Sequence, residues 1–206
     1  MSIRHYPDKC GWYDFGDGCG PVPAHKHTRG SGWVADTARV ADTAFVGLDA
    51  RVYGYGIVYD HAWVFDNARV YGYGKVYDDA RVYGRGKVYD FARVGGRAHV
   101  YGDARVDGRA HVYSDARVGR RAQVSDNARV SGQALVHDYA QVYGDTQVSG
   151  NILIRGHSQV YTVTPEQATI LVLKYGDEIR FESLDSQLVQ VYDRHAITKA
   201  AVYEHA

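Results

Sequence analysis

The residues best suited to bind a metal ion lie near the start of the chain. They are two thiols and two imidazoles, which are the ligand types of structural zinc sites: Cys10, Cys19, His25 and His27. Neither the spacing of the two cysteines nor the His-x-His arrangement matches a standard zinc finger. Two interpretations stay open, a zinc site and a terminal cap with reduced cysteines and surface histidines. No other cofactor is expected.

Five further histidines could act as general bases in catalysis. They are His61, His99, His111, His137 and His157. Each falls at an outward or corner position of a regular sequence unit, with no carboxylate placed to orient the imidazole. We therefore favour binding over catalysis, and the question of an enzyme stays open.

A repeat of six residues positions these side chains. From Val34 to Val160 an aliphatic residue stands at every sixth position, and all except Ile154 are valine. Ala or Gly precedes it by two residues from Gly32 to Ala140, and Gly or Asp usually follows it by two. Residues two apart share one face of an extended strand, whereas Gly and Asp support positive backbone torsion angles at a corner. The pattern predicts a short strand and a turn per unit, and its period excludes a helix.

Strands of this kind bury their Val and Ala side chains only by coiling into a parallel β-helix. The repeat resembles the hexapeptide repeat of left-handed parallel β-helix proteins, in which three hexapeptides make one triangular coil of about 18 residues. The resemblance implies the left hand. We therefore expect an all-β fold with about seven coils over residues 32–162, roughly 34 Å long at ~4.8 Å per coil.

The two ends of such a helix need covering. Residues 1–31 are expected to form an N-terminal cap and residues 163–206 a C-terminal cap. Within the second cap, residues 169–175 and 178–182 alternate like the strands of a β-hairpin. Residues 188–192 suit a third strand, and residues 196–204 suit a short helix.

A closer resemblance is to the polymer-forming, hexapeptide-repeat proteins of phages and prophages, including those of the YdcK type. The segments Asp14-Phe15-Gly16-Asp17 and Gly30-Ser31-Gly32-Trp33-Val34 carry it, and the tail from Leu173 to His195 is loosely similar. For a protein carried by a phage, the resemblance implies a counter-defence role as an expectation. Such a protein would dock on a bacterial immune effector, for example a CRISPR nuclease.

Many hexapeptide-repeat proteins are acyltransferases, and resemblance to them implies a catalytic histidine between the subunits of a trimer. This chain departs from their pattern, because the repeat runs from Val34 to Val160 without the inserted loop that usually builds the acyl-donor site. An acyltransferase is therefore the alternative function. A self-assembling structural protein is a second alternative.

Wrapping the chain at 18 residues per coil sorts the outward side chains into rows. Twelve aromatic residues fall between Phe45 and Phe91. They could simply stack along the sheets, but large exposed aromatic patches usually mark a partner surface, and Tyr, Trp and Arg are common interface anchors. We expect contact with a partner, or with a second copy, through Arg51, Tyr53, Tyr55, Trp63, Phe65, Arg69, Tyr71 and Tyr73.

Positive charge is concentrated between residues 81 and 121, which hold ten Arg or Lys and four Asp. Arg81, Arg85, Arg117 and Arg121 are expected on or beside one face, where they could contact nucleic acid or an acidic protein. A solvated face balanced by aspartates at the corners is the alternative.

The composition bounds the remaining choices. The 206 residues carry no formal net charge, which disfavours a wholly basic nucleic-acid binder and an acidic DNA mimic. No apolar run suits a membrane span or a signal peptide, so we expect a cytoplasmic protein, in the host cell if a phage encodes it. We predict a non-enzymatic binding protein with a protein or ribonucleoprotein partner.

Overall fold

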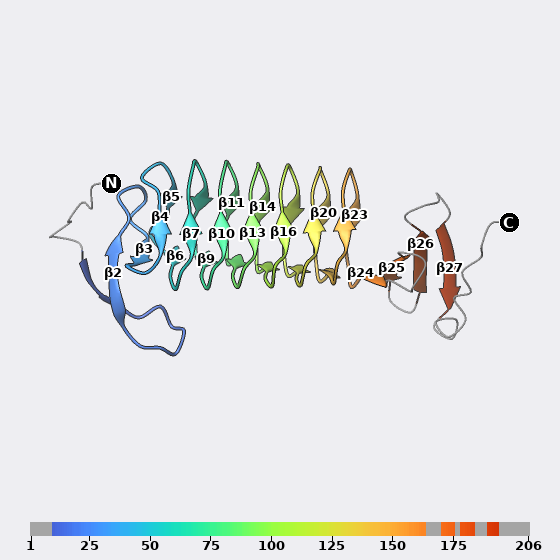
Figure 1. Cartoon of the computed structure of the whole chain (residues 1–206), viewed down its shortest axis with the longest axis horizontal. Helices are drawn as coiled ribbons and strands as arrows, with labels where there is room; N and C mark the ends of the chain where they lie inside the picture. Colours follow the sequence, from blue (N-terminus) through green and yellow to red (C-terminus); the bar gives the residue numbers. More distant parts are fainter. Residues whose placement is uncertain (1–9, 164–169, 176–177, 184–188, 194–206) are drawn as a thin grey trace.

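The computed structural model describes residues 10–163, 170–175, 178–183 and 189–193, and every regular element in these ranges is a β-strand. Figure 1 shows coils stacked along one axis into a rod. Sheet A contains β1 (Cys10–Tyr13), β2 (Val22–Lys26), β3 (Trp33–Ala35), β6 (Arg51–Val52), β9 (Arg69–Val70), β12 (Lys87–Val88), β15 (Arg105–Val106), β18 (Gln123–Val124), β21 (Gln141–Tyr143), β24 (Gln159–Val163), β25 (Ile170–Tyr175), β26 (Glu178–Ser183) and β27 (Val189–Asp193).

The other two sheets have seven strands each. Sheet B contains β4 (Arg39–Val40), β7 (Ile57–Val58), β10 (Lys75–Val76), β13 (Arg93–Val94), β16 (His111–Val112), β19 (Arg129–Val130) and β22 (Gln147–Val148). Sheet C contains β5 (Phe45–Val46), β8 (Trp63–Val64), β11 (Arg81–Val82), β14 (His99–Val100), β17 (Arg117–Val118), β20 (Leu135–Val136) and β23 (Leu153–Ile154).

The chain visits sheets A, B and C in turn, and each solenoid strand pairs in parallel with the strand one coil later, as Arg51 does with Arg69. The turns between successive sheets form the A–B, B–C and C–A corners. These data confirm the predicted all-β parallel β-helix of about seven coils. Its left hand stays a prediction, and the helix expected over residues 196–204 lies outside the described residues.

Both terminal segments extend sheet A. Strands β1, β2 and β3 pair antiparallel at one end, and β24 to β27 do so at the other, where the sequence suggested a hairpin and a third strand. The loop between β2 and β3 covers the N-terminal edge of sheet C. There the Val46 amide donates to the Arg29 carbonyl at 3.0 Å, and the Gly32 amide donates to the Val46 carbonyl at 2.9 Å.

Valine and alanine side chains fill the interior. Every repeat valine from Val46 to Val142 has no exposed surface, and the alanines two residues before them are equally buried. A fully buried valine is worth about 1.5–3 kcal/mol relative to an exposed one. Because the interior is filled with these side chains, any binding or chemistry must take place on the outside of the rod.

Aspartate carboxylates at the corners form hydrogen bonds between neighbouring coils. Asp66 and Asp78 hold positive φ angles of 54° and 57°, which Asp tolerates better than most residues. The Gly84 amide donates to the Asp66 carboxylate at 3.0 Å, and the Gly96 amide donates to that of Asp78 at 2.8 Å. Each carboxylate therefore binds a backbone amide one coil further along.

Aromatic rings form stacks that run between coils. On sheet C the rings of Phe65, Tyr83 and Tyr101 are nearly parallel, with centroids 5.0 and 5.5 Å apart. The last ring of this stack lies over Gly119, where an added methyl group would overlap it.

The stacks on the other sheets also end on a small side chain. On sheet B the Tyr77 ring lies over Gly95. On sheet A the Tyr89 hydroxyl donates to the Asp107 carboxylate at 2.6 Å. The last rings of these three stacks therefore lean toward the following coil, where a Gly or Asp leaves room for them.

We predict that Gly119→Ala destabilises the protein by about 1–3 kcal/mol, because the new methyl group displaces the Tyr101 ring. In a Tyr101→Ala background the same change should stabilise by ~0.4–1 kcal/mol, since alanine then only restricts the unfolded chain. Denaturant unfolding of the wild type, the two single variants and the double variant measures this change of sign. Gly11→Ala is the control, because a methyl group there meets no atom within 4 Å. An equal cost of Gly119→Ala in both backgrounds would contradict the overlap.

A second prediction concerns the corner aspartates. Asp126 has a φ of 57°, and its carboxylate accepts the Gly144 amide at 3.0 Å. Asp126→Asn keeps both properties and should be nearly neutral, whereas Asp126→Gly loses only the acceptor and should cost about 1 kcal/mol. Asp126→Ala should cost most, because alanine also resists a positive φ. Thermal unfolding and hydrogen exchange of the Gly144 amide test this order, and it is wrong if Gly costs as much as Ala.

Candidate interaction surface

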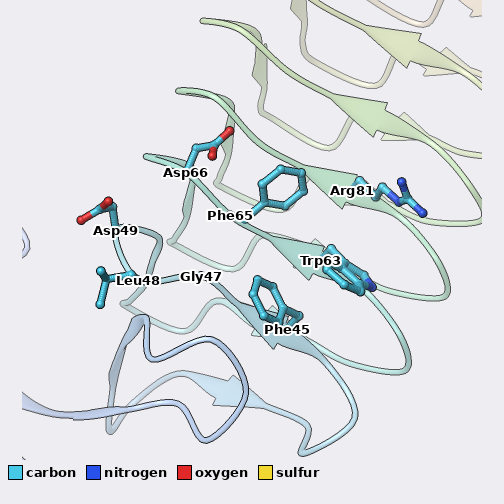
Figure 2. A pocket seen from close by; sticks show the side chains of 8 residues that line it. All are labelled: Phe45, Gly47, Leu48, Asp49, Trp63, Phe65, Asp66 and Arg81. Atoms are coloured by element: carbon cyan, nitrogen blue, oxygen red, sulfur yellow. The ribbon is translucent and has the colours of Figure 1, made fainter.

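Apolar side chains gather in a hollow of about 520 Å³ at the N-terminal end of sheet C. Its lining consists of Phe45, Gly47, Leu48, Trp63 and Phe65, which together we call the aromatic hollow; Asp49, Asp66 and Arg81 form its rim. Figure 2 shows Phe45 and Trp63 in line along the sheet and Leu48 on the C–A corner. The two rings of Phe45 and Trp63 stack at 4.7 Å, and Trp63 meets Phe65 edge to face at 6.5 Å.

Two members of the aromatic hollow expose much of their surface. Trp63 is 41% exposed and Leu48 is 63% exposed. Leu48 also breaks the repeat, since the same corner position carries Asp66 one coil later and Gly84 after that. Gly47 leaves space at the base of the aromatic hollow, because a methyl group there would lie only 3.0 Å from Cβ of Phe65.

The structure brings several of the predicted contact residues together on sheet C. Trp63 and Phe65 line the aromatic hollow, and Arg81 stands at its rim. Arg81 pairs in register with His99, and His99 with Arg117, so these three extend the same outer face away from the hollow. Arg81 and Arg117 are exposed.

Other predicted contact residues lie on a different side of the rod. Tyr55 and Tyr73 project from the A–B corner, with rings 5.1 Å apart and exposed fractions of 56% and 48%. That corner is opposite sheet C, because the chain passes from A through B to C. The predicted set therefore does not form one continuous surface.

Tyr53, one of the predicted contact residues, is covered by the N-terminal segment. It is only 5% exposed because Phe15 of the N-terminal segment stacks on its ring at 4.9 Å. Arg51 is held by the same segment, since its guanidinium donates to the Phe15 carbonyl at 3.2 Å and lies 5.5 Å from the Tyr13 ring centre. The repeat could not show this cover, because residues 13–15 lie outside it.

Tyr71 and Arg69 are partly covered on sheet A. The Tyr71 ring lies between those of Tyr53 and Tyr89, with centroids at 5.0 and 4.8 Å. Burial raises the pKa of Tyr71 to about 12, so its hydroxyl stays neutral. Arg69 is half-buried in the adjoining row.

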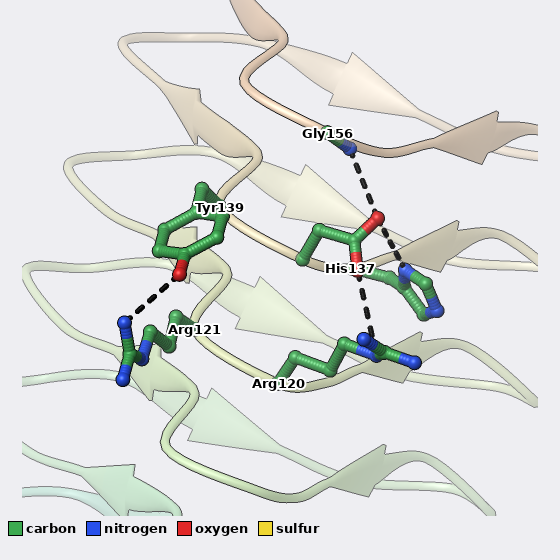
Figure 3. Close-up of polar contacts among 6 residues, drawn as sticks. Arg120, Arg121, His137, Tyr139 and Gly156 are labelled. Carbon is green, nitrogen blue, oxygen red and sulfur yellow. Dashed lines mark hydrogen bonds and ion pairs between the residues drawn. The ribbon is translucent and has the colours of Figure 1, made fainter.

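The remaining predicted arginines have partners at the C–A corner. Arg85 forms an ion pair with Asp103, with Nε 2.8 Å from Oδ1. Arg121 donates to the Tyr139 hydroxyl at 2.9 Å and lies 5.4 Å from the centre of its ring (Figure 3). Part of the expected basic surface is therefore already occupied by contacts within the chain.

One histidine does have a carboxylate beside it, contrary to expectation. His137 Nδ1 lies 3.1 Å from Oδ2 of Asp138 (Figure 3). Desolvation acts to raise the pKa of Asp138, but the Gly156 amide, His137 and Arg120 together outweigh it and lower this pKa. Because Gly156 and Arg120 also bind the carboxylate, the cluster ties coils together. His137 and Asp138 both fit the regular repeat, so the sequence pattern gives no sign of their contact. Only the side-chain geometry reveals it.

The four residues proposed as zinc ligands are only partly described. The Cys10 and His25 backbones pair across β1 and β2, and Cys19 is free and exposed. His25 Nδ1 lies 2.8 Å from Asp36, whereas His27 is buried and bonds a backbone carbonyl through Nε2 at 3.1 Å. Where residues are described, no three His, Cys, Asp or Glu side chains gather around a common point. The zinc site stays a prediction.

Comparisons with known proteins bear on the repeat. Residues 122–138 match the family model described as the YdcK β-solenoid repeat. No match was found among curated proteins. Within the described ranges, no helix is long and apolar enough to span a membrane. The matched segment covers one pass from β18 to β20, and the same register continues through the neighbouring coils. The chain is thus a parallel β-solenoid protein with a YdcK-like repeat.

Proposed function

We propose that the chain is a non-enzymatic binding protein that presents the aromatic hollow to a protein partner. The observation that supports this most directly is the exposed apolar lining, with Trp63 41% and Leu48 63% exposed. Exposed apolar patches of this kind commonly mark interaction sites, and tryptophan is enriched among the residues that dominate binding energy.

The fold itself does not require apolar residues at these positions. In the row that holds Phe45 and Trp63, the next coils carry Arg81 and His99. These coils keep the same backbone register, and their valines are equally buried. The aromatic hollow is therefore an addition to the repeat, which favours a role in binding over a role in folding.

The hollow suits a partner with a defined chemistry. Its lining would take an apolar side chain, and Arg81 at the rim would pair with a nearby carboxylate of the partner. The rings are already stacked at 4.7 Å, so little conformational entropy is lost on binding. The choice of a bacterial defence effector, such as a CRISPR nuclease, as this partner rests on the resemblance to phage and prophage proteins.

An acyltransferase is less well supported by the same geometry. Among the five histidines considered as general bases, His137 has Asp138 beside it, and the Gly156 amide and Arg120 share that carboxylate. A carboxylate engaged in three contacts holds the coils together and is poorly placed to assist proton transfer. Self-assembly through the aromatic hollow is the other alternative, and the experiment below distinguishes it.

We predict that Leu48→Asp and Trp63→Ala each weaken partner binding by about 30-fold, the effect of losing an anchor worth ~2 kcal/mol. Asp occupies the same corner position one coil later, at Asp66, so Leu48→Asp should leave unfolding nearly unaffected. Leu153→Gln is the control, because Leu153 is 53% exposed in the same row at the far end of sheet C. Binding is measured by titrating partners that the wild-type protein captures from the host.

Light scattering of the same variants distinguishes the outcomes. A drop in mass with Leu48→Asp but not with Leu153→Gln would identify a second copy as the occupant of the hollow. If both hollow variants keep every captured partner and the wild-type mass, the proposed function is wrong.

A further inference from the structure

Charge is segregated between the corners and the outer faces of the solenoid. Between residues 32 and 162 there is no Glu, and every Asp except Asp107 lies at a corner. Most Arg and Lys residues instead occupy the outward positions of the strands. The outer faces of sheets B and C therefore carry no carboxylate in the repeat.

Cations have carboxylate partners at the corners but not on the outer faces of sheets B and C. At the corners, Arg85 pairs with Asp103 and Arg97 with Asp115 one coil later, each at 2.8 Å. On the outer faces, cations stack on cations in register, which is unfavourable for directly opposed side chains. An arginine at a corner can thus be neutralised by an aspartate of the next coil. The cations on the outer faces have no such aspartate.

Sheet A has a row of four cations, Arg51, Arg69, Lys87 and Arg105, but the N-terminal segment holds Arg51; sheet B carries a row of equal length that lies away from the terminal segments. Lys75 pairs with Arg93, Arg93 with His111, and His111 with Arg129. In the described part of the chain, none of these four forms an ion pair. Burial first, and then the positive charges of Arg93 and Arg129, lower the pKa of His111.

We infer that the outer face of sheet B binds the phosphate backbone of a nucleic-acid strand through Lys75, Arg93, His111 and Arg129. The row is straight, with a spacing of ~4.8 Å and a length of roughly 14 Å. A straight row of cations matches a ligand whose charges repeat along a line better than the irregular surface of an acidic protein. Guanidinium groups also bind phosphate in a bidentate manner.

The same face offers little for reading bases. The Tyr59 and Tyr77 rings face each other at 5.3 Å, and Tyr77 in turn lies over Gly95. These two ring faces are therefore not free to stack on a base, whereas Tyr113 on the same face is 39% exposed and open to such stacking, which is tolerant of base sequence. Binding should follow the backbone charge, with strong salt dependence and little sequence preference.

The test is fluorescence anisotropy of labelled oligo(dT) with the full chain. The double variant Arg93→Gln/Arg129→Gln should bind at least about tenfold more weakly at low salt. The matched control Arg85→Gln/Arg97→Gln removes the same charge from corner positions and should bind like the wild type. About three phosphate contacts predict a slope of log K against log salt near −2.

Several results would overturn the inference. One is an equal loss in both double variants, which would indicate net charge alone. Another is no measurable binding at low salt, and a third is poly-Glu competing as well as unlabelled oligo(dT), which would assign an acidic protein instead. Leu48→Asp should leave oligo(dT) binding unchanged, so failure of the aromatic hollow and failure of this face can be told apart.

Discussion

The hydrogen bonds between each strand and the strand one coil later are the interaction on which the rest of this structure depends. The amide of Tyr53 donates to the carbonyl of Val70 at 3.0 Å, and the same bond recurs from Tyr71 to Val88 and onward. Because the coil closes at a constant length, every residue has a fixed neighbour above and below. Side chains therefore act in rows, whether they are buried valines, stacked rings or cations. A change at one position alters one place in one row and leaves the backbone register intact.

The regularity explains which parts of the protein could be predicted from sequence. The six-residue period places Val and Ala inside and sets the register that brings Phe45 beside Trp63. The period carries no information about segments outside the repeat, so the cover that Phe15 places over Tyr53 was missed. The period also does not determine toward which neighbouring coil an aromatic ring tilts. That lean follows from side-chain packing, in which the Tyr101 ring settles over Gly119. The His137–Asp138 pair was missed for a similar reason, since both residues fit the repeat and only their side-chain torsions bring them together.

A filled interior also restricts where function can lie. Enzymes commonly build their sites in deep pockets, but the described hollows of this rod are shallow and lie on its outer faces, as the aromatic hollow does. Such a surface gains affinity from rigidity, because stacked side chains lose little entropy when a partner arrives. Stacking also shapes the surface chemistry. Rings that pair with each other, such as Tyr59 and Tyr77, present their edges outward, and this favours contacts with apolar side chains or charged groups over base stacking.

The B–C corner separates the two surfaces proposed here. It carries Asp60, Asp78 and Asp79, between the cations of sheet B and the face of sheet C. A phosphate backbone lying on sheet B would be repelled by these carboxylates if it crossed the corner, so it should stay on its own face. A protein that fills the aromatic hollow meets no such barrier on sheet C, where Arg81 and Arg117 extend the face. A rigid rod that holds these two faces apart is suited to a partner that contains both protein and nucleic acid, because each component would meet the face that matches its charge.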